Sequence, residues 1–184
     1  ILCDDSWMGH CAKYQLHSGG KRFRALLALI AADIFKINYE SAIYAAVCCE
    51  FIHNASLIHD DLQDRDLLRR GLPTIWNRFG DHTAINLGDY FIAGSFEALS
   101  KIKGNPENKC KAIEHLSYTI QQTVKGQSLE ILERSNLNLR MEEYESTAKA
   151  KTGGLICWPI KLVMILNGEK NIDEINFKPL YEAG

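Results

Sequence analysis

Hydrophobic residues recur at intervals of three and four along almost the whole chain, and no segment alternates strictly between hydrophobic and polar residues. The first spacing is typical of amphipathic helices, whereas alternation is typical of strands. The pattern therefore predicts an all-α protein. The predicted helices cover residues 21–35, 41–66, 83–102, 107–134, 141–151 and 155–166.

Residues that break or cap helices lie between the predicted segments. A glycine pair at 19–20 precedes the first helix, and Ser41 is the expected N-cap of the second. Residues 67–80 contain Gly71 and Pro73, so we expect a loop with a short helix there.

Length and composition favour one domain, spanning residues 1–184, because 184 residues with 46% hydrophobic side chains suffice for a single buried core. The net charge of −2 leaves no basic surface that would bind nucleic acid. The uncharged apolar runs are shorter than the ~18 residues that a membrane span needs. Six cysteines without a Cys-x-x-Cys pair indicate buried thiols in a reducing compartment. We therefore expect a soluble, cytoplasmic protein.

A group of carboxylates lies in the segment EFIHNASLIHDDLQDRDLLRRG at residues 50–71. On a helix, Asp60 and Asp64 share a face, while Asp61 lies about 100° round from Asp60. Carboxylates at this spacing repel one another unless a cation neutralises them. Mg²⁺ is typically held by one or two carboxylates together with substrate phosphates. The alternative explanation is a solvated acidic helix end.

Two groups of basic residues accompany the carboxylates. Arg69 and Arg70 follow them closely, and guanidinium groups match phosphate oxygens. The segment GGKRFR at 19–24 places Lys21 and Arg24 on one face at the start of a helix, where free N–H groups also favour anions. A solvated helix start would explain this segment alone, but all three groups together predict a diphosphate bridged by Mg²⁺.

Two further candidates have equally simple structural explanations. His53 lies seven residues before Asp60, nearly on the same face, although a core histidine is the commoner role. Lys151 and Thr152 precede a glycine pair, where C-capping of a helix would also explain them.

Six motifs, in order, resemble those of the trans-isoprenyl diphosphate synthases, also called the polyprenyl synthetase family, and geranylgeranyl diphosphate synthases in particular. They are GGKRFR at 19–24, HDDLQD at 59–64, RRG at 69–71, GD at 88–89, GQSLE at 126–130 and KTGG at 151–154. The resemblance implies an isoprenoid-synthase-type helical bundle around a central cavity, usually a homodimer. It also implies a Mg²⁺-dependent prenyltransferase that joins isopentenyl diphosphate to dimethylallyl, geranyl or farnesyl diphosphate and releases diphosphate.

The sequence departs from the family pattern in three places. Ala25 stands where proline is usual, and Glu130 stands where aspartate is usual. The second aspartate-rich motif of the family, normally downstream of a segment like 180–184, is absent from the sequence. We therefore expect the chain to represent the front portion of the family fold.

The same resemblance assigns roles to the candidate residues. The metal ligands would be Asp60 and Asp64, with Asp61 supporting them. The residues that hold isopentenyl diphosphate would be Lys21, Arg24, His53 and Arg70, and those that hold the allylic diphosphate would be Arg69, Lys151 and Thr152. The catalytic set would be Asp60, Asp61, Asp64, Arg69 and Lys151.

Product length depends on how far the growing tail can run below the aspartates. Ser56 and Ala55 lie four and five residues before Asp60, about one helical turn of ~5.4 Å, which is comparable to one isoprene unit. Both side chains are small, so the sequence predicts a product of twenty or more carbons, with geranylgeranyl diphosphate as the first choice. Further down the same helix, Phe51 is the only large residue that we expect to block the growing tail.

Other functions fit less well. A non-catalytic partner subunit would not need the intact acidic and arginine groups. A carboxylate-bridged di-iron bundle would explain Glu50-x-x-His53, but it needs a second Glu-x-x-His, which the sequence lacks. A metal phosphohydrolase would need more histidines in helical segments, and a terpene cyclase has no second diphosphate for the basic segment at 19–24 to hold.

Overall fold

The computed structural model describes residues 4–133, 153–169, 172 and 177. The helices are α1 (Trp7–His17), α2 (Phe23–Ile34), α3 (Tyr39–Asp64), α4 (Ile75–Phe79), α5 (Asp81–Lys101), α6 (Pro106–Glu133) and α8 (Gly154–Asn167). Two short strands, β1 (Leu68–Arg69) and β2 (Leu72–Pro73), pair as an antiparallel hairpin. The predicted all-α class is confirmed.

The helix boundaries agree with the prediction to within two residues for α2, α3, α5, α6 and α8. The helix predicted at 141–151 lies outside the described residues. The predicted N-cap of α3 is wrong: Asn38 caps this helix, and its side chain accepts the N–H of Ser41 at 2.9 Å. Ser41 is the third residue of the helix, whose N–H a cap normally takes.

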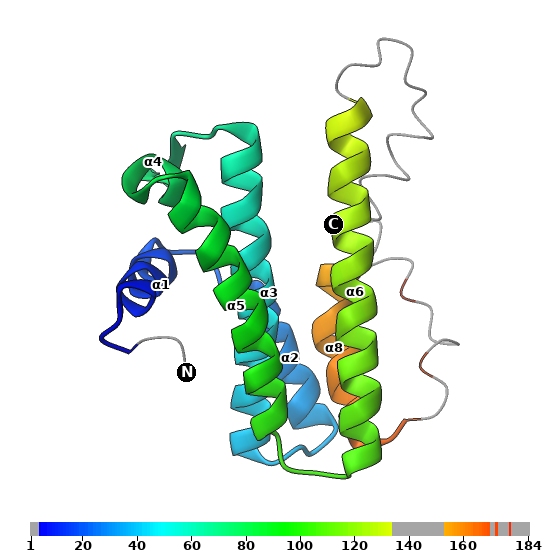
Figure 1. Ribbon diagram of the computed structural model, residues 1–184. Coiled ribbons are helices and arrows are strands. Elements are labelled where there is room, and N and C mark those ends of the chain that lie inside the picture. The colour runs from blue at the N-terminus through cyan, green and yellow to red at the C-terminus, as the bar shows by residue number, and fades with distance from the viewer. Residues whose placement is uncertain (1–3, 134–152, 170–171, 173–176, 178–184) are drawn as a thin grey trace.

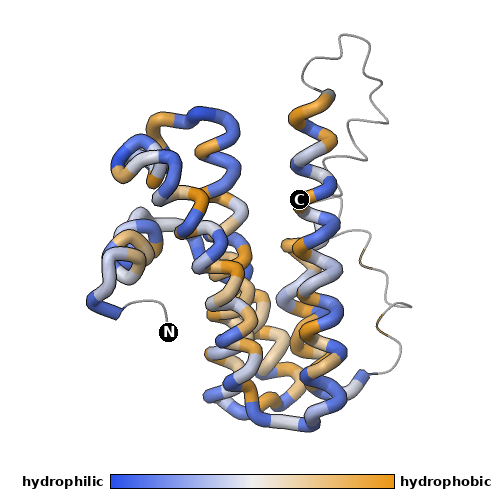
Figure 2. Tube along the Cα trace, viewed as in Figure 1, coloured by the Kyte–Doolittle hydropathy of each residue, from blue (hydrophilic) through white to orange (hydrophobic). Residues whose placement is uncertain are grey.

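The helices form two walls that converge at one end (Figure 1). Helices α3 and α5 lie side by side in one wall, α6 and α8 pack together in the other, and α2 packs against both α3 and α8. Hydrophobic segments gather where these helices converge, whereas the far end of α3 and the neighbouring α4 are more hydrophilic (Figure 2). The polar ends therefore lie above an apolar base.

The hydrophobic core has two main parts, and α3 contributes to both. One part joins α2, α3, α5, α6 and α8 and includes Leu99, Leu116, Trp158 and Leu162. The other joins α1, α3, α4 and α5 and includes Ile58, Ile75, Leu87 and Phe91. All eight side chains are at most 1% exposed, and burying each stabilises the fold by about 1.5–3 kcal/mol.

Helix α3 is long and apolar enough to cross a membrane if length and hydropathy alone are considered. However, 67% of its most apolar window is buried inside the described bundle, as expected for a core helix. Cys11, Cys48, Cys49 and Cys157 are buried as predicted, while Cys110 is exposed. Burial raises the pKa of Cys48 to about 12, so this thiol stays protonated and unreactive.

Candidate functional site

The three aspartates lie in the last turns of α3 and take different positions. Asp60 and Asp64 are half-buried and stand one turn apart, whereas Asp61 is 2% exposed. Arg69 covers Asp61: its Nε donates to Asp61 Oδ1 at 2.6 Å, and its Nη2 lies 2.5 Å from the same oxygen. Arg69 Nη2 also lies 4.0 Å from Asp60 Oδ2. Asp61 therefore holds Arg69 in place, next to the carboxylate pair formed by Asp60 and Asp64.

Burial and charge act in opposite directions on the Asp61–Arg69 pair. Burial raises the pKa of Asp61, and the hydrogen bond and positive charge of Arg69 oppose that rise. The hydrogen bond to Asp61 raises the pKa of Arg69 above its ordinary value. The guanidinium of Arg69 is therefore charged at neutral pH, next to the carboxylate pair.

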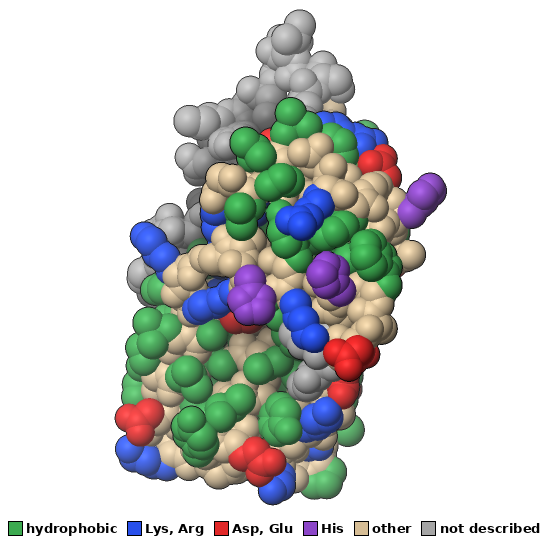
Figure 3. Space-filling model, turned by 90° about the vertical axis from the view of Figure 1, so that its left-hand side faces the viewer, with side chains coloured by type: hydrophobic (Ala, Val, Ile, Leu, Met, Phe, Trp, Pro, Cys, Tyr) green, Lys and Arg blue, Asp and Glu red, His purple; other side chains and the backbone are tan. Residues whose placement is uncertain are grey.

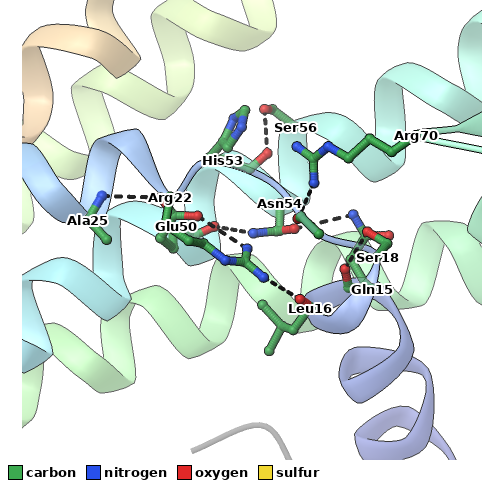
Figure 4. Close-up of polar contacts among 11 residues, drawn as sticks. Gln15, Leu16, Ser18, Arg22, Ala25, Glu50, His53, Asn54, Ser56 and Arg70 are labelled. Carbon is green, nitrogen blue, oxygen red and sulfur yellow. Dashed lines mark hydrogen bonds and ion pairs between the residues drawn. The ribbon is translucent and has the colours of Figure 1, made fainter.

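The β1–β2 hairpin explains how two consecutive arginines reach different places. Its two-residue turn consists of Arg70 and Gly71, both with positive φ (55° and 80°), as in the tight turns that suit hairpins. Arg70 Nη1 donates to the carbonyl of Gly19, before the start of α2 (Figure 4). Gly20 has a φ of 120°, which residues with a side chain rarely adopt, and a Cβ there would lie 2.6 Å from Arg70 Nη1, so glycine suits this position.

A cationic pocket of about 480 Å³ lies at the start of α2. It is lined by Lys21 and Arg24, by His53 from α3, and by Arg70 from the hairpin. The structure thus brings together the four residues that the family resemblance assigns to one diphosphate. Among the described residues, Arg24 Nε is buried without a hydrogen-bond partner, although buried donors are normally satisfied. A phosphate oxygen would satisfy it.

His53 is neutral at physiological pH. Burial is the main cause that lowers its pKa to about 3, and the positive charges of Arg24, Arg70, Arg69 and Arg22 lower it further. A neutral imidazole offers one N–H to an anion without adding repulsion among the cations. A bound anion would raise the pKa of His53.

An apolar cavity of about 370 Å³ lies between the two walls of the bundle and begins at the acidic end of α3. Its polar end includes Asp60, Gln63 and Gln127, and Gln127 Nε2 donates to Gln63 Oε1 at 2.9 Å. The side chains that line its apolar part come from four helices: Ile52, Ala55, Ile92, Ile120, Val124 and Leu155. Arg24 and His53 line both this cavity and the cationic pocket, so the two spaces adjoin each other at these side chains.

The structure corrects one expectation about the cavity and leaves others open. Phe51 does not line it; its ring packs edge-on against Phe91 at 5.3 Å, in the core between α3 and α5. Ile52 lines the cavity instead, on the same face as Ser56, four residues later. Lys151 and Thr152 lie outside the described residues.

Magnesium ligands were predicted at Asp60 and Asp64. Within the described residues, no group of three or more His, Cys, Asp or Glu side chains converges as a metal site. A pair of carboxylates is nevertheless the donor set with which proteins hold Mg²⁺ when substrate phosphates complete its coordination. The two aspartates therefore fit a metal that arrives with a phosphorylated substrate.

The chain is similar to known geranylgeranyl pyrophosphate synthases. A geranylgeranyl pyrophosphate synthase of Geoglobus acetivorans is 35% identical over 173 residues, 94% of this chain and 53% of that protein. A solved structure of such an enzyme from the same archaeon has a TM-score of 0.89 at 32% identity, covering 100% of this chain and 60% of that chain.

Two further similarities concern a subunit and a complex. Heptaprenyl diphosphate synthase component 2 of Bacillus subtilis is 36% identical over 184 residues, 100% of this chain and 51% of that protein. A geranyltransferase of Helicobacter pylori, crystallised with magnesium and isoprenyl diphosphate, has a TM-score of 0.81 at 27% identity, covering 96% of this chain and 60% of that chain.

The chain spans about half the length of the curated relatives it matches. Its residues 5–183 match the family model described as polyprenyl synthetase. With the adjoining cationic pocket and apolar cavity, this match identifies the chain as a member of the polyprenyl synthetase family.

Proposed function

We propose that this chain carries the first metal site and the isopentenyl diphosphate site of a Mg²⁺-dependent trans-prenyl diphosphate synthase. Residues 1–184 would form the front portion of one polyprenyl synthetase domain. The observation that carries the proposal is that the cationic pocket adjoins the apolar cavity, with Arg24 and His53 lining both. A diphosphate bound in the cationic pocket would have its hydrocarbon part next to the apolar cavity.

The carboxylate pair would hold magnesium together with the allylic diphosphate. A metal held by Asp60 and Asp64 would supply positive charge that stabilises the leaving diphosphate when the allylic C–O bond breaks. Arg69, held by Asp61 and close to Asp60, adds a fixed positive charge on the same side. The complex of the Helicobacter pylori relative with magnesium supports this assignment. Lys151 and Thr152 would complete the allylic diphosphate site.

The cationic pocket would bind isopentenyl diphosphate. Lys21, Arg24 and Arg70 would neutralise the phosphates, and His53 would donate one hydrogen bond. The double bond of this substrate would then face the apolar cavity, where the allylic tail lies. Low polarity and the exclusion of water protect a developing carbocation from attack by water. Released diphosphate would accept the proton, so no side-chain base is required.

The small side chains in the upper part of the α3 wall support a product of twenty or more carbons, with geranylgeranyl diphosphate as the first choice. Ser56 and Ala55 leave the upper part of the α3 wall open, and Ile52 stands a further turn below Ser56. A tail can therefore pass the first turn below Asp60 before it meets a branched side chain.

A second candidate is a subunit that acts with a partner chain, which the similarity to a heptaprenyl synthase component supports. We favour a homodimer, because the family that the motifs resemble usually forms one, and the hydrophobic side chains on the lower half of one face of the bundle (Figure 3) would suit such an interface. Light scattering of the purified protein would distinguish a monomer from a dimer.

Calorimetric titration with isopentenyl diphosphate tests the proposed pocket. Arg70→Ala should weaken binding about tenfold or more, because a hydrogen bond between a charged donor and phosphate contributes about 1.5–3 kcal/mol. The matched control is Arg65→Ala, which removes another arginine near the end of α3 that pairs with Asp81 instead. Equal affinity in wild type and Arg70→Ala would contradict the proposal.

A further inference from the structure

The first turn of α2 lacks a cap from its own N-terminal residue. Its N-cap is Arg22, in the left-handed region (φ 49°, ψ 36°), and no side chain at that position accepts a hydrogen bond from the helix. The free N–H groups of a first helical turn need acceptors, and the side chain at the N-cap normally supplies one. Because α2 begins between Lys21 and Arg24, its start determines how both residues point.

Glu50 of α3 supplies the missing acceptor. Its Oε1 accepts the backbone N–H of Ala25, the third residue of α2, at 3.1 Å, and its Oε2 lies 3.4 Å from Arg22 Nη1 (Figure 4). The third position is one whose N–H a capping side chain normally takes. A carboxylate there is also favoured by the positive end of the helix dipole. Glu50 therefore caps α2 from a neighbouring helix.

The surrounding residues hold both partners of this contact. Arg22 Nη2 donates to the carbonyl of Leu16, so Arg22 joins the end of α1 to Glu50. Asn54 Nδ2 donates to the carbonyl of Glu50 at 2.8 Å, and Gln15 Nε2 donates to Asn54 Oδ1 at 3.2 Å. The guanidinium of Arg22 is therefore engaged by Leu16 and Glu50, which distinguishes Arg22 from Lys21 and Arg24 in the same motif.

Charge alone does not explain a carboxylate at this place. Glu50 is 8% exposed and lines the cationic pocket, where its negative charge opposes the binding of a diphosphate. Burial of a carboxylate is costly unless hydrogen bonds and charges compensate it. The geometry of its two oxygens provides that compensation and identifies what the carboxylate does, which is to accept a hydrogen bond from α2.

We propose that Glu50 is a positioning residue: as a hydrogen-bond acceptor for the first turn of α2, it fixes Lys21 and Arg24 in the arrangement that binds isopentenyl diphosphate. This inference rests on the proposed function of the cationic pocket. The carboxylate itself would not contact substrate. The side chain must be long enough for its oxygen to accept the backbone N–H of Ala25, and its negative charge is less important.

Two substitutions of Glu50 distinguish the effect of side-chain length from the effect of charge. Glu50→Asp keeps the charge but shortens the side chain by one methylene, so the acceptor no longer reaches Ala25. Glu50→Gln keeps both the length and the acceptor oxygen but removes the charge. The matched control is Glu40→Asp, which shortens a glutamate on the same helix that pairs with Lys103 away from the pocket.

Steady-state kinetics with each substrate varied in turn, and circular dichroism of every variant, provide the test. Glu50→Asp should raise the KM for isopentenyl diphosphate by about tenfold and change that for the allylic substrate by less than about twofold. Glu50→Gln should stay within about threefold of wild type for both substrates, and Glu40→Asp should match wild type.

The opposite pattern would overturn the inference. If the charge were decisive, Glu50→Asp would resemble wild type and Glu50→Gln would change the KM. If Glu50 only stabilised the fold, both KM values and the helical content would change together. If calorimetry shows that wild type does not bind isopentenyl diphosphate, the proposed function fails and this inference fails with it. If wild type binds isopentenyl diphosphate and Glu50→Asp has the same KM as wild type, the positioning role of Glu50 is refuted but the proposed function is not.

Discussion

Replacing Ser56 with phenylalanine puts a rigid ring into the apolar cavity one turn below Asp60. Ser56 lies four residues before Asp60, about 6 Å along the helix axis, and Ile52 lies eight residues before it, about 12 Å. A ring at position 56 therefore closes about 6 Å of the α3 wall, which is comparable to one isoprene unit. The product should become five carbons shorter, fifteen in place of twenty.

Ser56 is a better position for this test than Ala55. Ala55 is 3% exposed and packs in the core shared by α1, α3, α4 and α5, so a ring there would disturb the core as well as the cavity. The reverse change, Ile52→Ala, should deepen the cavity and lengthen the product. It should also destabilise the fold by about 2–5 kcal/mol, because it removes a buried side chain.

Chromatography of the products made from isopentenyl diphosphate and a labelled allylic starter measures these lengths. Ile43→Phe is the matched control, because Ile43 is 39% exposed on the same helix and does not line the cavity. An active Ser56→Phe variant with products of wild-type length would refute the reasoning. A wild-type product of fifteen carbons or fewer would show that another wall sets the length.

Two further predictions concern the charged groups. In steady-state assays, Lys21→Ala should mainly raise the KM for isopentenyl diphosphate, and Lys151→Ala should mainly raise the KM for the allylic substrate. If each variant raised the two KM values equally, the assignment of Lys21 and Lys151 to different diphosphates would be refuted. Because the pKa of His53 is about 3 in the folded protein, against 6.5 ordinarily, the unfolded chain takes up its proton first as the pH falls. Urea unfolding should therefore show that wild type loses about 1–2 kcal/mol more stability between pH 7 and pH 5 than His53→Gln does. Equal losses would mean that His53 is protonated normally, despite Arg24 and Arg70 beside it.

Periodicity predicted the parts of the site that lie on one helix or next to a helix start. Asp60 and Asp64 share a face because of the spacing alone, and the basic residues at 19–24 marked the start of α2. The capping of α3 by Asn38 was missed because Ser41, a strong N-cap type itself, lies three residues later. Helix α1 was missed, although Ser6, a residue type common at N-caps, precedes it and accepts the N–H of Gly9.

The walls of the cavity depend on how the helices pack, and no local pattern reveals this. Ile92, Ile120 and Leu155 come from α5, α6 and α8 and meet only in the folded bundle. The choice of Phe51 as a deep stop failed because adjacent residues on a helix differ by about 100°, which turned Ile52 to the cavity and Phe51 to the core. The contact between Glu50 and Ala25 was equally hidden, since it joins positions 25 residues apart.

Transfer of labelled isopentenyl diphosphate to an allylic starter, measured with and without magnesium, tests the central claim most directly. Wild type should turn over only with the metal. The double variant Asp60→Ala/Asp64→Ala should lose activity by orders of magnitude while its helical content stays largely intact. Asp66→Asn, which alters an exposed carboxylate just beyond α3, is the matched control and should retain activity. Unchanged turnover in the double variant, or equal turnover when EDTA removes the metal, would contradict the claim.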